Sequence, residues 1–126
     1  MRAIDTNVLV RLLTRDEADQ TDRAESFIAN GAWVSHLVLV ETIWVLDSVY
    51  GLGRKQIATA VEMLLDHEQL IIENPDVILA ALEDSRAHKG VGLADCLILQ
   101  TARKAGHLPL GTFDRALSGL AGAEKL

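Results

Sequence analysis

Four carboxylates are placed where an acid has a chemical use: Asp5, Glu41, Asp95 and Asp114. Three of them lie where a predicted strand meets a predicted helix or where a predicted helix begins. In a parallel sheet such junctions share one edge, the edge at which α/β proteins form their sites. Carboxylates gathered there would repel one another unless a cation lay among them. Because ligands that are all oxygen suit Mg²⁺ or Mn²⁺, the pattern predicts a site for a hard divalent cation.

Each aspartate also has a purely structural explanation. Asp5 and Asp114 are well placed to cap the helices that follow them. Asp95 lies in the first turn of its predicted helix, where a negative charge complements the helix dipole. Ile98 and Leu99, one turn further on, place Asp95 on a face that points inward.

Glu41 has a weaker structural explanation. It lies in a strongly apolar helical segment, and its neighbours one turn away on either side are Leu37, Val38, Trp44 and Val45. A carboxylate buried there without a partner would cost several kcal/mol or become protonated. The alternatives are a solvated glutamate at the edge of a groove and a glutamate paired with an arginine.

Strands that alternate with helices would position these acids. The apolar pattern predicts strands at 1–4, 32–36, 69–73 and 107–112. Predicted helices cover 7–13, 14–31, 36–51, 53–68, 75–87, 92–106 and 113–117. The alternation predicts an α/β fold, a three-layer α/β/α sandwich with a mainly parallel sheet of four or five strands. Since no linker, repeat or low-complexity segment interrupts it, we expect one domain over 1–126.

Composition restricts the class of protein further. Hydrophobic residues make up 49% of the 126 residues and aromatic residues only 4%, which predicts a core of aliphatic side chains. No segment approaches the roughly 18 apolar residues of a membrane helix. The single cysteine, Cys96, suits a reducing compartment, so we expect a cytoplasmic protein without membrane contact. The net charge of −6 argues against a nucleic-acid partner, unless several acids bind metal cations.

Four segments together resemble the PIN-domain family, most closely its bacterial VapC-type ribonuclease toxins. They are "AIDTNVLVRLL", "VLVETIWVL", "GLADCLILQTARKAG" and "GTFDRAL", in the family's order and over nearly the whole chain. The segment "HLPLGTFD" departs from the family pattern because Pro109 enters a strand that is usually a plain apolar run. The resemblance implies that the catalytic metal ligands are Asp5, Glu41, Asp95 and Asp114, with Asn7 and Thr112 as polar supports.

The resemblance also implies an activity and partners. It implies hydrolysis of RNA phosphodiester bonds with one or two Mg²⁺ or Mn²⁺ ions, which activate a water and stabilise the leaving oxygen. It further implies a toxin of a type II toxin–antitoxin system, a small VapB-like antitoxin and a homodimer. Basic residues near the acids would contact RNA phosphates; we expect this role for Arg11, Arg86 and Arg115, with Arg15 and Lys89 nearby. Their alternative role is that of ordinary surface cations.

Two other classes of function remain open at this point. A phosphatase or phosphotransfer domain on a similar sheet would carry Asp-x-Asp after the first strand, but Asn7 occupies the second acidic position. A catalytically inert PIN-like binding module would keep the fold without the chemistry. The presence of all four acids argues against an inert module.

Overall fold

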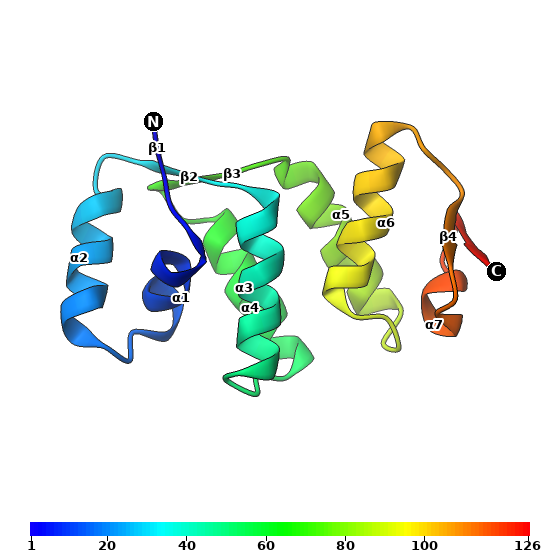
Figure 1. The fold of residues 1–126 in the computed structure, drawn as a ribbon, viewed down its shortest axis with the longest axis horizontal. Coiled ribbons are helices and arrows are strands. Elements are labelled where there is room, and N and C mark those ends of the chain that lie inside the picture. Colours follow the sequence, from blue (N-terminus) through cyan, green and yellow to red (C-terminus); the bar gives the residue numbers. More distant parts are fainter. The chain divides into compact units, whose positions relative to one another are not determined.

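Helices and short strands alternate along the whole chain in the computed structural model, which describes residues 1–126 (Figure 1). The chain divides into two compact units, Met1–Glu73 and Asn74–Leu126. Each unit contains its own parallel sheet and its own helices, and each is described by itself.

The first unit contains a three-stranded parallel sheet and four helices. Its strands, in sheet order, are β1 (Arg2–Ala3), β2 (Ala32–Val34) and β3 (Leu70–Ile72). Its helices are α1 (Thr6–Thr14), α2 (Ala18–Ile28), α3 (His36–Ser48) and α4 (Arg54–Leu65). Parallel pairing requires a crossover between successive strands, and helices provide both crossovers.

Aliphatic stripes on the helices form the core of the first unit. In α3 the buried residues Leu39, Ile43 and Leu46 recur at spacings of four and three, which places them on one helix face. Leu9 and Val10 of α1 are buried as well, and α1 contacts both α2 and α3. This packing fixes the start of α1, where Asp5 lies, relative to α3, which carries Glu41.

The start of α3 is held by two acceptors from different segments. The Ser35 hydroxyl oxygen accepts a hydrogen bond from the Val38 backbone N–H at 3.2 Å. The Glu73 carboxylate, directly after β3, accepts one from the His36 N–H at 2.8 Å. Two of the N–H groups that a helix start leaves unpaired are therefore satisfied.

Replacing Ser35 with alanine is expected to lower the free energy of unfolding by about 1 kcal/mol, because the Val38 N–H loses its acceptor. Glu73 still accepts the hydrogen bond from the His36 N–H, so the stability lost is that of a single capping hydrogen bond. Urea unfolding of wild type and variant measures the difference. Ser48→Ala, at the other end of α3, is the control, and an equal loss in both variants would contradict the capping role.

The second unit is built around a pair of packed helices and a small parallel sheet. Its helices are α5 (Pro75–Ala87), α6 (Leu93–Ala105) and α7 (Arg115–Ser118), and its strands are β4 (Leu110–Thr112) and β5 (Ala123–Lys125). The helices α5 and α6 contact each other extensively, with Ile78, Leu82, Leu97 and Leu99 buried. The Lys104 ammonium group lies 2.8 Å from the Asp76 carboxylate and lowers the pKa of Asp76 by its hydrogen bond.

The α/β class and the parallel strand pairing predicted from the sequence are confirmed. The five strands, however, form two sheets, of three and two strands, where the sequence predicted a single sheet. Each strand contributes only two or three residues to its ladder, so these sheets are small. None of the helices has the length and apolar character needed to cross a membrane.

One predicted helix boundary was wrong, and one strand was missed. The second helix begins at Ala18, where position 14 was expected, because α1 continues to Thr14 and Arg15 then adopts a left-handed conformation with φ 53°. The strand β5 was missed, since "AEK" carries no apolar pattern and pairs with β4 through its backbone. Pro109 lies just before β4, where it removes no ladder hydrogen bond.

Candidate metal site

Asp5 connects β1 to α1 and caps the helix. Its Oδ1 accepts a hydrogen bond from the Val8 backbone N–H at 3.2 Å, while the side chain stays exposed. The structural explanation for Asp5 is therefore correct. It does not exclude the functional one, because no hydrogen bond occupies Oδ2, which is left for a ligand.

Glu41 is exposed on α3, so the desolvation argument made from the sequence was wrong. Its apolar neighbours on the same face are exposed too: Leu37 by 83% and Trp44 by 63%. The buried face of α3 is the opposite one, through Leu39 and Leu46. A solvated carboxylate carries no burial penalty, and the assignment of Glu41 as a ligand remains a prediction.

Asp95 and Asp114 are brought together within the second unit. Asp95 is half-buried in the first turn of α6, and this burial raises the pKa of its carboxyl group. The negative charge of Asp114 raises the pKa of Asp95 further, so the two carboxylates lie close enough to repel. Asp114 also caps α7, its Oδ1 accepting from the Leu117 N–H at 2.9 Å.

The two predicted polar supports have different surroundings. The Thr112 hydroxyl oxygen accepts a hydrogen bond from the Asp114 backbone N–H at 3.0 Å. This bond fixes the turn between β4 and α7, from which the Asp114 side chain projects. Asn7 is exposed and lies beside Asp5 on the wall of a groove. Thr112 therefore orients the candidate ligand Asp114, and Asn7 is placed to contact a molecule that binds next to Asp5.

The groove beside Asp5 has a volume of about 390 Å³ and opens between α1 and α2. Besides Asp5 and Asn7 it is lined by Arg11, Gln20, Arg23 and Phe27, among others. A carboxylate, two guanidinium groups and an aromatic ring thus border the same groove. Sequence reasoning missed the contribution of α2, because the groove exists only where α2 packs beside α1.

Arg11 is less available for RNA than the sequence suggested. Its guanidinium group donates to the Gln20 side chain at 2.8 Å, to Asp16 at 2.7 Å and to the Tyr50 hydroxyl at 3.2 Å. The hydrogen bond with Tyr50 is the main cause of the raised pKa of Arg11. Arg86 lies in the last turn of α5 and Arg115 begins α7. Both are exposed, and the phosphate-binding role of Arg11, Arg86 and Arg115 remains a prediction.

Neither unit alone gathers three or more Asp, Glu, His or Cys side chains closely enough to hold a metal ion. The first unit supplies Asp5 and Glu41 from helices that contact each other, and the second supplies the mutually repelling pair Asp95 and Asp114. All four side chains offer only oxygen atoms, as Mg²⁺ and Mn²⁺ prefer. A divalent cation would relieve the repulsion in that pair, so the donors of this chain fit such an ion.

Sequence reasoning also missed Glu73. It follows β3 as Asp5 follows β1, and its carboxylate is committed to the His36 N–H at the start of α3. Its position directly after a predicted strand was the signal in the sequence that could have identified Glu73. Glu73 contributes to the site by fixing the helix that carries Glu41.

The structure defines an α/β protein that carries carboxylates at the starts of three helices. A model of the PIN domain family matches residues 3–123. The chain therefore belongs to the PIN-domain family, a family of nucleases.

A search of curated proteins found no match to the chain. Among solved structures, the crystal structure of Mycobacterium tuberculosis VapC20, a sarcin–ricin loop cleaving toxin, is similar with a TM-score of 0.43 and 20% identity. That similarity covers 98% of this chain and 98% of the other.

Proposed function

We propose that this chain is a divalent-metal-dependent endoribonuclease that acts as the toxin of a toxin–antitoxin pair. The observation that carries the proposal is the family match, which runs over both units and includes all four candidate acids. The VapC-type assignment rests on the resemblance of the segments around those acids. We accordingly treat residues 1–126 as one catalytic domain.

The proposed ligands of one or two Mg²⁺ or Mn²⁺ ions are Asp5, Glu41, Asp95 and Asp114. When bound, such an ion supplies an activated water near neutral pH and neutralises charge on the leaving oxygen. The caps at Asp5 and Asp114 each fix one carboxylate oxygen and so orient the other.

The residues around the ligands have supporting roles. Glu41 is exposed and carries no hydrogen bond, so its carboxylate is available to orient a water as well as to bind metal. Thr112 fixes the turn that carries Asp114. Cys96 is fully buried beside Asp95 and is assigned a packing role, since a buried thiol cannot reach a substrate.

The partners follow from the toxin assignment and belong to the same proposal. They are an RNA substrate, a small VapB-like antitoxin and a second copy of the chain in a homodimer. A cytoplasmic location agrees with a single, buried cysteine that forms no disulfide.

The test is cleavage of a labelled RNA by the purified chain. We expect cleavage with Mg²⁺ or Mn²⁺ and none with chelator, also when both RNA ends are blocked, because an endonuclease needs no end. A phosphomonoester such as p-nitrophenyl phosphate is offered in parallel. Its hydrolysis without RNA cleavage would indicate the phosphatase alternative, and RNA binding without cleavage would indicate an inert module.

A further inference from the structure

The groove between α1 and α2 offers positively charged and aromatic side chains, which a cluster of acids lacks. A site built only of carboxylates repels the phosphate backbone that it must cleave. The groove is lined by Asp5, Asn7, Gln20, Arg23 and Phe27, among others. Arginines next to an aromatic ring are the combination with which proteins hold single-stranded nucleic acid.

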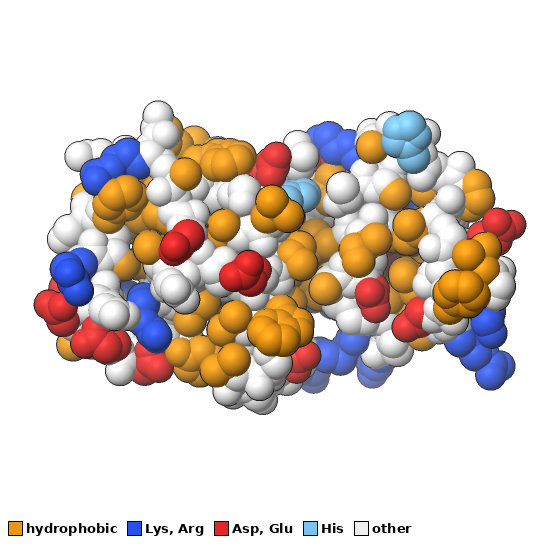
Figure 2. Space-filling model, in the orientation of Figure 1, with side chains coloured by type: hydrophobic (Ala, Val, Ile, Leu, Met, Phe, Trp, Pro, Cys, Tyr) orange, Lys and Arg blue, Asp and Glu red, His pale blue; other side chains and the backbone are white.

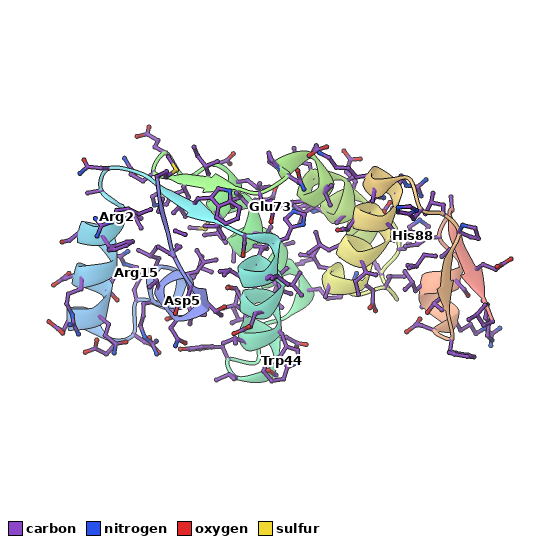
Figure 3. The ribbon with its side chains drawn as sticks, turned by 45° about the horizontal axis from the view of Figure 1, so that its top comes forward. Arg2, Asp5, Arg15, Trp44, Glu73 and His88 are labelled. Atoms are coloured by element: carbon purple, nitrogen blue, oxygen red, sulfur yellow. The ribbon has the colours of Figure 1, made fainter.

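Arg2 supplies a cation at the aromatic end of this groove. The central carbon of its guanidinium group lies 3.6 Å from the centroid of the Phe27 ring. No carboxylate is paired with it, so its charge is uncompensated within the protein. Figure 3 labels Arg2 on β1 and Asp5 just before α1, so the same short segment carries this cation and the candidate metal ligand.

Arg23 supplies a second cation, from α2. Its only ion pair is with Asp19 one turn earlier, at 3.1 Å, and both side chains are 74% exposed. Such a solvated pair is weak, so a phosphate can compete for the guanidinium group. Figure 2 shows basic and acidic side chains interspersed over the α2 end of the first unit, so a cation there can exchange a carboxylate partner for a phosphate.

We infer that the groove between α1 and α2 binds a nucleotide of single-stranded RNA next to the cleaved phosphodiester, with Arg2 and Arg23 contacting backbone phosphates. The volume of about 390 Å³ is in the range of pockets that hold one small molecule. In this arrangement Phe27 holds Arg2 in position, and Arg11 holds the wall of the groove through Asp16 and Gln20. The inference rests on the proposed ribonuclease function and adds the path by which RNA reaches Asp5.

The experiment measures binding of a fluorescein-labelled oligouridine by anisotropy, in chelator, over a series of NaCl concentrations. The variants are Arg2→Gln, Arg23→Gln and Phe27→Leu, which keeps the apolar contact but removes the ring. Lys55→Gln is the matched control, because Lys55 is an exposed cation of the same unit that lines a different groove. Melting curves establish that each variant is folded.

We expect Arg2→Gln and Arg23→Gln each to weaken binding about tenfold, as the loss of a charged hydrogen bond does. Each is also expected to reduce the slope of log affinity against log salt by about 0.7, the value for one single-strand phosphate contact. Phe27→Leu should act like Arg2→Gln, whereas Lys55→Gln should leave the slope unchanged.

Two failures are distinguishable. If wild type cleaves RNA with Mg²⁺ but the arginine variants keep the wild-type slope and affinity, RNA enters by another face and this inference is overturned while the function stands. If wild type neither binds nor cleaves RNA, the proposed function fails, and the inference fails with it. If Lys55→Gln weakened binding as much as Arg23→Gln, the cause would be a general loss of positive charge, and the inference that the groove binds RNA would also be overturned.

Discussion

Replacing Asp5 with asparagine is expected to reduce Mg²⁺-dependent RNA cleavage at least about a hundredfold, while the melting temperature stays nearly the same. A metal ligand contributes several kcal/mol to the transition state, and about 2.7 kcal/mol already corresponds to a hundredfold. Asparagine caps a helix about as well as aspartate, so the hydrogen bond to the Val8 N–H is retained. Cleavage rates and thermal melts of the same preparations measure the two effects.

Two further variants separate the cap from the charge. Asp5→Ala loses both and should therefore also lose about 1 kcal/mol of stability. Asp66→Asn removes an exposed acid at the end of α4 that is not a proposed ligand and does not line the groove, and it should cleave normally. If Asp5→Asn cleaves like wild type and only Asp5→Ala is impaired, Asp5 is merely a helix cap.

Replacing Asp95 with asparagine is expected to stabilise the metal-free protein at neutral pH by roughly 0.5 kcal/mol and to abolish both cleavage and stabilisation by Mg²⁺. Burial and the charge of Asp114 raise the pKa of Asp95 in the folded state, so ionisation of Asp95 costs folding energy. The gain is at the low end of that for relaxing a functional site, because solvent screens this half-exposed carboxylate. The metal effect disappears because stabilisation depends on the ratio of free ion to its dissociation constant.

The pH dependence has a definite sign. A raised folded pKa means that the folded protein binds the proton more tightly than the unfolded chain, whose pKa is about 3.9. Wild-type stability should therefore fall, relative to the variant, as pH rises from that value through the raised pKa of Asp95, and the difference should vanish below it. Urea unfolding across this range, with chelator and with Mg²⁺, measures it. If Asp95→Asn is destabilised and is still stabilised by Mg²⁺, the role of Asp95 is only to complement the dipole of its helix.

The order of helices and strands was predictable because periodicity and end signals agree. Pro75 at the start of α5 and Gly106 at the end of α6 mark their helices in the sequence. The strand β5 was not predictable, since "AEK" becomes a strand only through pairing with β4. Pairing between distant segments leaves no local pattern, which is also why the division into sheets of three and two strands was missed.

The helix starts that carry three of the candidate ligands were predictable, whereas the surroundings of the candidate ligands were less so. The starts of α1, α6 and α7 at the three aspartates follow from local signals, and the structure agrees with them. The exposure of Glu41 was not predictable, because an apolar helix face is buried only if another element covers it, and Leu37 and Trp44 are uncovered. The contact of Arg2 with the Phe27 ring joins β1 to α2 beside the groove, a juxtaposition that no spacing along the chain reveals.

The double use of Asp5 and Asp114 as helix caps and as proposed ligands bears on how such proteins diverge. Asparagine preserves both caps, and a single-base change in an aspartate codon produces it. Selection for folding would not oppose such a change, since the helix starts lose nothing. If both residues are metal ligands as proposed, inactive descendants that still fold are one mutation away, so catalysis can be lost in a gene lineage long before the fold is lost.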